Sequence, residues 1–214
     1  KQFAAASLVA PLASYATISE EELEKRIIPY GKRYVSYDDI HVAIIGFGIM
    51  GSRNAKTILQ IPGRKLKAVC DLYKGRLERA KELYGTDLFV TQSYQDVLNR
   101  SDIDAVIICT SDQWHDKISI DAMRKRKAVY CEKPMVHQLS QGWEVINVQQ
   151  QTGVVLQVGS QRVSSIAYAE AKKFYKAGEI GQLNCIEASF DRHTALGAWQ
   201  YTMPLDASMD TIAW

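Results

Sequence analysis

The stretch that decides the fold is residues 40–71, IHVAIIGFGIMGSRNAKTILQIPGRKLKAVCD. Residues 41–45 are mostly apolar, which indicates a strand that is buried on both faces. A glycine-rich turn follows, and after it come the helical pattern of residues 52–60 and a second apolar run at residues 66–70. This order of strand, glycine turn, helix and strand predicts a βαβ unit of an α/β protein.

The glycine turn has the sequence Gly46-Phe47-Gly48-Ile49-Met50-Gly51. Gly46 permits a tight turn, and Gly48 lets a pyrophosphate approach the backbone. Gly51 permits close packing of the next helix, whose first N–H groups then face the phosphates. We therefore predict that this whole loop binds a dinucleotide cofactor.

Asp71 ends the second strand, 20 residues after Gly51. At this position its carboxylate should accept hydrogen bonds from the adenosine ribose and repel a 2′-phosphate, so we expect NAD rather than NADP. The alternative is that Asp71 only caps a helix. Lys74 and Arg76 follow closely enough to leave some tolerance of NADP, and we include Arg76 among the cofactor-binding residues.

The rest of this region repeats the alternation of strand and helix. Further strand-like apolar runs lie at residues 88–90, 105–109, 128–131 and 154–158, and helical patterns lie at residues 77–84, 94–98, 116–125 and 140–150. Continuous apolar runs separated by helices predict a doubly wound parallel Rossmann sheet covered on both faces. Its ligand should bind at the carboxyl ends of the strands.

The chain divides into a nucleotide-binding domain at residues 39–159 and the incomplete start of a second domain at residues 160–214. In the second part we expect a helix at residues 164–177 closed by Gly178, then a strand at residues 183–190. One helix and one strand are too little to close a core. We therefore expect the chain to stop within an α+β substrate and oligomerisation domain built on an open sheet.

The first residues resemble the end of an export signal. Residues 3–12 are largely apolar, and Ser14 and Ala16 are small residues spaced as at a cleavage site. We expect residues 1–16 to be a signal-peptide remnant of the twin-arginine type, with a periplasmic location. The alternatives are an amphipathic helix of the mature protein and a cytoplasmic location. Residues 17–38 then form an N-terminal arm, in which Ser19 and Glu22 predict a capped helix from about residue 20 to Pro29.

Composition and charge exclude some classes of partner. The chain is 47% hydrophobic and has 26 basic and 24 acidic residues, a net charge of +2. Such a balance gives no field that would attract nucleic acid or an anionic membrane surface. The basic run of residues 124–127 is interpreted as a solvated helix end rather than a binding patch.

The four cysteines are Cys70, Cys109, Cys131 and Cys185. They show no CxxC pairing and no histidine at the spacing of metal ligands, so no metal site is predicted. Each lies in or next to an apolar run, which is typical of buried free thiols. A disulfide between Cys109 and Cys131 is the one alternative, because their strands should be neighbours.

Two polar segments follow predicted strands and should face the same crevice. They are Thr110-Ser111-Asp112-Gln113-Trp114-His115 and Cys131-Glu132-Lys133-Pro134. A lysine beside a carboxylate at this edge can exchange a proton with a substrate hydroxyl next to the nicotinamide. A merely solvated Lys133 fits the sequence equally well.

The glycine loop, the Glu132-Lys133-Pro134 segment and residues 156–162 together resemble the Gfo/Idh/MocA family of oxidoreductases. The resemblance implies that Lys133 is catalytic and binds the substrate, and Arg162 is the further candidate for substrate binding. It also implies that the following residues lie near the cofactor: Thr110, Ser111, His115, Glu132, Lys133 and Gln161.

There are departures from the family pattern. Thr110-Ser111 stands where many members have Thr-Pro, and Asp112-Gln113 where they have Asp-His. The family's later Asp/His pair would lie beyond Trp214, so we expect the 214-residue chain alone to be inactive.

The resemblance implies an NAD-dependent oxidoreductase that acts on a sugar, cyclitol or other polyol, or on a glycoside. If NAD stays bound and is recycled in place, elimination, epimerisation or glycoside cleavage without net redox change becomes possible. The alternative from another class is a non-catalytic protein of the same fold that senses a sugar or the cofactor. A homo-oligomer formed through the second domain is also expected.

Overall fold

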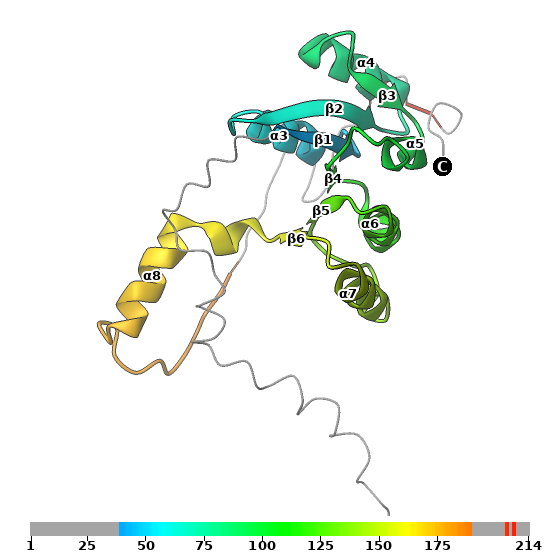
Figure 1. Ribbon diagram of the computed structural model, residues 1–214. Helices are drawn as coiled ribbons and strands as arrows, with labels where there is room; N and C mark the ends of the chain where they lie inside the picture. The colour runs from blue at the N-terminus through cyan, green and yellow to red at the C-terminus, as the bar shows by residue number, and fades with distance from the viewer. Residues whose placement is uncertain (1–38, 190–203, 206, 209–214) are drawn as a thin grey trace, which may run out of the picture. The chain divides into compact units, whose positions relative to one another are not determined.

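The computed structural model describes residues 39–189, 204–205 and 207–208 (Figure 1). The predicted cleavage site, the capped helix after Ser19 and the N-terminal arm lie outside these residues. The described part is built on one parallel sheet with the strand order β3-β2-β1-β4-β5-β6. The strands are β1 (Ile40–Ile45), β2 (Arg64–Cys70), β3 (Phe89–Thr91), β4 (Ala105–Ile108), β5 (Ala128–Glu132) and β6 (Leu156–Gly159).

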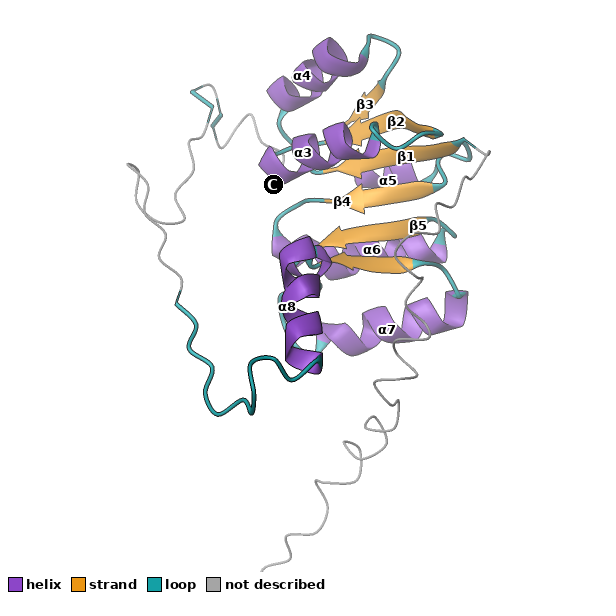
Figure 2. Cartoon of the chain, turned by 90° about the vertical axis from the view of Figure 1, so that its left-hand side faces the viewer, coloured by secondary structure: helices purple, strands orange, loops and turns teal. Residues whose placement is uncertain are grey.

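Helices alternate with these strands along the chain. They are α3 (Ile49–Ile58), α4 (Lys74–Tyr84), α5 (Tyr94–Leu98), α6 (His115–Arg124), α7 (Gln141–Thr152) and α8 (Ile166–Lys176), with short 3-10 turns η1 (Asp112–Trp114) and η2 (Gln161–Ser164). Figure 2 shows α3 and α6 on opposite faces of the sheet. The predicted doubly wound Rossmann sheet is therefore confirmed.

The sheet is buried on both faces because each strand sends alternate side chains to opposite sides. In β1, Val42 and Ile44 pack with residues of α3 and α4 in one apolar cluster. Ala43 and Ile45 pack on the other face with residues of α5, α6 and α7. A central strand covered on both sides has no polar face, which explains the nearly continuous apolar run from which it was predicted.

Since the strands are parallel, all their carboxyl ends meet at one edge of the sheet. Hydrogen bonds fix the loops at this edge: the Gly46 N–H donates to the Cys70 carbonyl at 2.8 Å, and the Cys109 N–H to the Ile45 carbonyl at 2.8 Å. The loop after β1 is thus held between the ends of β2 and β4.

Three expectations are corrected. The described part of the predicted strand at 183–190, residues 183–189, forms no strand and does not join the six-stranded sheet. Lys127 is buried at 6% exposure, whereas the basic run was expected to be solvated. Cys185 is exposed, although Cys70 and Cys131 are buried as expected.

The helix in the second part is confirmed as α8, and Gly178 follows it with φ of 74°. Among the described residues, no helix is both long enough and apolar enough to cross a membrane.

Candidate functional site

The glycine loop packs so closely on its neighbours that no side chain would fit at Gly46 or Gly51. A Cβ at Gly51 would lie 1.9 Å from the Gly46 carbonyl oxygen, and one at Gly46 would lie 2.6 Å from the Cys109 carbonyl carbon. Gly46 also has φ of 90°, a conformation that favours glycine. Any larger residue at either position would therefore displace the loop from β4 or from α3.

The outer side of the same loop is open. Among the described residues, and apart from the chain neighbours of Gly48, a Cβ at Gly48 would have within 4 Å only atoms of the Arg76 guanidinium, at 3.9 Å. Gly48 is also the N-cap of α3, which has no side-chain capping bond and no acidic residue in its first turn. The first N–H groups of a helix attract anions when no side chain caps them. This surface is thus suited to a phosphate or pyrophosphate.

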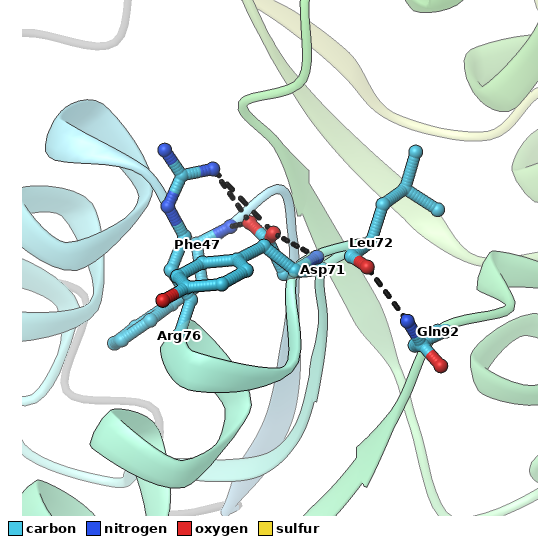
Figure 3. A network of polar contacts seen from close by, with 6 residues as sticks. Phe47, Asp71, Leu72, Arg76 and Gln92 are labelled. Carbon is cyan, nitrogen blue, oxygen red and sulfur yellow. Dashed lines mark hydrogen bonds and ion pairs between the residues drawn. The ribbon is translucent and has the colours of Figure 1, made fainter. Parts of the chain in front are cut away.

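Asp71 lies at the end of β2, directly behind this loop (Figure 3). It is 6% exposed, and its Oδ2 accepts a hydrogen bond from the Phe47 N–H at 2.7 Å. Its Oδ1 accepts one from the Tyr73 N–H, at the start of α4, at 2.9 Å. Tyr73 is the N-cap of α4 and no side chain caps this helix, so the helix-capping alternative for Asp71 is wrong. One oxygen of Asp71 holds the turn before α4, and the other anchors the glycine loop.

Arg76 and Gln92 complete this network. Arg76 Nη1 lies 3.4 Å from both Asp71 oxygens. Gln92 Nε2 donates to the Leu72 carbonyl at 2.6 Å and so joins the loop after β2 to the segment after β3 (Figure 3). Asp71 is held from two sides, which fixes the direction of its carboxylate.

A pocket of about 280 Å³ lies at the carboxyl ends of β4 and β5. It brings together seven of the residues predicted to bind the cofactor or substrate and three that were not named as binding residues. Its lining residues are Met50, Cys109, Thr110, Ser111, Asp112, His115, Glu132, Lys133, Pro134 and Gln161. Asp71 and Arg76 lie outside this pocket, at the end of β2 and in α4.

Glu132 is the buried carboxylate of the pocket, at 5% exposure. Asn54 Nδ2 donates to its Oε1 at 3.0 Å. Gln161 Nε2 lies 3.3 Å from Oε1 and 3.1 Å from Oε2. Gln161 and Glu132, which were both expected near the cofactor, are thus in contact with each other, and Asn54 was missed. The one sequence signal for Asn54 is its spacing, three residues after Gly51 on the helix face that packs on the sheet.

His115 is 2% exposed and joins the two loops of the pocket through their backbones. Its Nδ1 lies 2.6 Å from the Pro134 carbonyl oxygen, and its Nε2 lies 3.1 Å from the Thr110 carbonyl oxygen. His115 thus supports the pocket wall, and both of its ring nitrogens face the protein.

Lys133 is exposed at the pocket, next to buried Glu132, and its peptide bond to Pro134 is cis. No carboxylate of residues 39–189 lies within ion-pair distance of its Nζ. Arg162 belongs to η2, and its predicted contact with a substrate falls on a side chain outside the described part. The pocket therefore offers an exposed amine beside a buried carboxylate.

Comparison with known proteins finds relatives over the same region. The scyllo-inositol 2-dehydrogenase (NAD(+)) of Bacillus subtilis is 36% identical over 144 residues, which are 67% of this chain and 42% of that protein. A glycosyl hydrolase family 109 protein of Shewanella baltica is 33% identical over 127 residues, 54% of this chain and 27% of that protein. The chain thus spans less than half the length of these relatives.

A solved structure resembles the fold as well. The scyllo-inositol dehydrogenase of Lactobacillus casei, with bound NAD(H) and scyllo-inositol, matches with a TM-score of 0.64 and 28% identity, over 67% of this chain and 43% of that one. Residues 40–160 match the model of an oxidoreductase family with an NAD-binding Rossmann fold. The chain therefore belongs to the Gfo/Idh/MocA family of oxidoreductases and carries the family's NAD-binding domain.

Proposed function

We propose that the protein oxidises a secondary alcohol of a cyclic polyol or sugar and transfers the hydride to NAD. The observation that carries this proposal is the pocket in which the exposed amine of Lys133 lies beside the buried carboxylate of Glu132. Relatives named as inositol dehydrogenases support a polyol as the substrate class.

The pyrophosphate of the cofactor is assigned to the glycine loop and the first turn of α3. The open space beside Gly48 and the uncapped start of α3 fit an anion held by backbone N–H groups. Asp71 is assigned to the adenosine ribose, where its charge disfavours the 2′-phosphate of NADP. We therefore propose NAD as the preferred cofactor, and tighter binding of NADP by the unmodified protein would contradict this.

The nicotinamide half is assigned to the pocket after β4 and β5. Thr110, Ser111 and Gln161 line it with hydroxyl and amide groups, which suit a ribose and a carboxamide. His115 is assigned a supporting role, because both of its ring nitrogens are directed at backbone carbonyls. Arg162, in the turn that follows β6, stays a candidate for substrate binding.

Bound NAD supplies the acceptor for the hydride. The alcohol must also lose its hydroxyl proton, and Lys133 in its neutral form accepts that proton. Glu132 stays buried behind Lys133 as an acceptor of hydrogen bonds from the cofactor.

The test incubates the native protein and NAD with a panel of inositols, sugars and glycosides. Oxidation is monitored as the increase in the absorbance of NADH. Growth of that absorbance with a cyclitol or sugar, and none with acyclic alcohols of similar size, is the expected result. Binding of NAD without turnover of any member of the panel would favour the non-catalytic sensing protein instead.

A second candidate is glycoside cleavage with NAD retained and recycled. It is favoured by the similarity to a protein named as a glycosyl hydrolase. In that case a chromogenic glycoside should release its phenol without net formation of NADH. Release should need an NAD-loaded protein, whereas an ordinary hydrolase would act without NAD.

A further inference from the structure

Glu132 is buried without a cationic partner. No lysine, arginine or histidine of residues 39–189 forms an ion pair with it, and within the same residues its hydrogen-bond donors are the side-chain amides of Asn54 and Gln161. Burial of a carboxylate is costly unless hydrogen bonds replace its lost hydration. The two amides therefore decide whether this carboxylate is tolerated in the pocket wall and where it points.

Asn54 joins three elements through one amide. It lies on α3, its Nδ2 donates to Glu132 at the end of β5 at 3.0 Å, and the same nitrogen lies 3.3 Å from Cys109 Sγ after β4. A flipped amide would place its oxygen against the carboxylate oxygen, which is repulsive, so the chemistry permits one orientation. Helix α3, which begins at the glycine loop, is thereby connected to the ends of β4 and β5.

The hydrogen bonds to Glu132 leave one side of its carboxylate available. Oε1 accepts from both Asn54 and Gln161, whereas Oε2 accepts only from Gln161 among the described residues. Each carboxylate oxygen has two lone pairs. Because Glu132 lines the pocket, the remaining capacity of Oε2 is available to a ligand there.

We propose that Asn54 is a positioning residue for the nicotinamide half of the cofactor. It directs the Glu132 carboxylate so that Oε2 accepts a hydrogen bond from a hydroxyl of the ribose attached to the nicotinamide. This inference rests on the cofactor binding of the proposed function and is independent of which alcohol is oxidised.

The test compares NAD with ADP in calorimetric titrations of the purified protein. ADP carries the adenosine and the two phosphates but no second ribose, so it reaches the glycine loop and Asp71 without reaching Glu132. Asn54→Leu removes the amide and keeps the number and branching of the side-chain heavy atoms. We expect a loss of roughly 10-fold or more in NAD affinity, as for a hydrogen bond to a charged group, with ADP affinity unchanged within about twofold.

Two further variants separate positioning from general damage. Asn54→Asp replaces the donor with a carboxylate next to Glu132, and its loss of NAD affinity should be at least as large. Thr57→Val lies one turn further along α3, where the hydroxyl donates only to the Arg53 carbonyl at 3.0 Å. This control should leave both affinities within about twofold.

A double-mutant cycle with Glu132→Gln identifies the path of the effect. If Asn54 acts through the carboxylate, Asn54→Leu should cost little further NAD affinity in the Glu132→Gln background. Equal losses for NAD and ADP, or fully additive losses in the cycle, would overturn the proposal. If Asn54→Leu does not fold, the same cycle with Asn54→Asp decides the question.

The proposed oxidation of a polyol can be wrong while the role proposed for Asn54 is right. A protein that binds NAD but oxidises no polyol removes the proposed substrate class and leaves this test intact. A folded protein that binds neither NAD nor ADP removes both.

Discussion

Arg76 Nη1 lies 3.4 Å from each carboxylate oxygen of Asp71, and the two side chains differ in exposure, at 45% for Arg76 and 6% for Asp71. Asp71 is held by backbone N–H groups, whereas Arg76 lies over the open side of Gly48. A buried anion and an exposed cation therefore flank the same surface of the glycine loop. The anion disfavours a 2′-phosphate, and the cation favours it.

We predict that Arg76→Ala lowers the affinity for NADP more than the affinity for NAD. Loss of a charge-assisted contact to a 2′-phosphate should reduce NADP affinity roughly 10-fold, as for a hydrogen bond between charged groups. NAD has no such phosphate, and Asp71 keeps its backbone contacts without Arg76. Titration of both cofactors into both proteins measures the ratio.

Arg79→Ala is the matched control, because Arg79 lies further along α4 and pairs with Glu82 at 2.7 Å. It should change neither affinity. If Arg76→Ala alters NAD and NADP binding by the same factor, Arg76 has no part in the choice between them.

The sheet was predictable because its strands are buried on both sides. In β1 and β4, apolar residues follow one another without a polar face, and each run ends in glycine or polar residues at the edge of the sheet that carries the candidate site. The predicted strand ends differ from the observed ones by one or two residues. Glu132 and Lys133 were placed correctly at the pocket because the end of a buried strand determines their location.

Other features depend on contacts that sequence patterns do not contain. Asn54 meets Glu132 across 78 residues, and nothing near Asn54 indicates which strand its face of α3 will touch. Lys127 has an ordinary basic neighbourhood, yet the turn after α6 directs it into the protein. The strand expected at 183–190 needed a partner strand, which no local pattern can supply.

We predict that Cys109 resists alkylation although it lines the pocket. Burial raises the pKa of its thiol to about 12. At pH 8 only about one thiol in ten thousand would then be the reactive thiolate. Mass spectrometry after brief treatment with iodoacetamide at pH 8 should find the exposed Cys185 modified and Cys109 intact.

The rate at which iodoacetamide labels Cys109 should rise with pH. Below its pKa, the thiolate fraction of Cys109 rises about tenfold for each unit of pH, so its labelling should accelerate by that factor between pH 8 and pH 9. Labelling of Cys109 as fast as that of Cys185 at pH 8 would show that the thiol is not protected by burial.

We predict that Lys127→Met destabilises the fold. Lys127 Nζ donates to the carbonyls of Arg100 and Ile103, at 2.8 Å each. Methionine fills similar space but leaves both carbonyls without this donor, at a cost of about 1–3 kcal/mol in the free energy of unfolding. Urea denaturation, monitored by circular dichroism, measures the change.

Lys125→Met, at an exposed neighbouring position, is the control and should leave the urea midpoint unchanged. An equal loss of unfolding free energy in both variants would contradict the role of the buried amine.

The last prediction concerns Lys133 and separates binding from catalysis. If Lys133 takes the hydroxyl proton as the hydride leaves, its removal withdraws a positioned base, which contributes roughly 10²- to 10⁴-fold to a rate. Lys133→Met in the native protein should therefore lower kcat by about that factor. Affinity for NAD should stay within a few-fold, because we assign the other half of the cofactor to the glycine loop and Asp71. Lys81→Met, on the surface of α4, is the control for the loss of a lysine and should keep full activity. A variant that lost NAD affinity and kcat together would point to a structural role for the turn after β5. Full turnover by Lys133→Met would remove Lys133 from the chemistry, and the proton would have to leave by another group of the site.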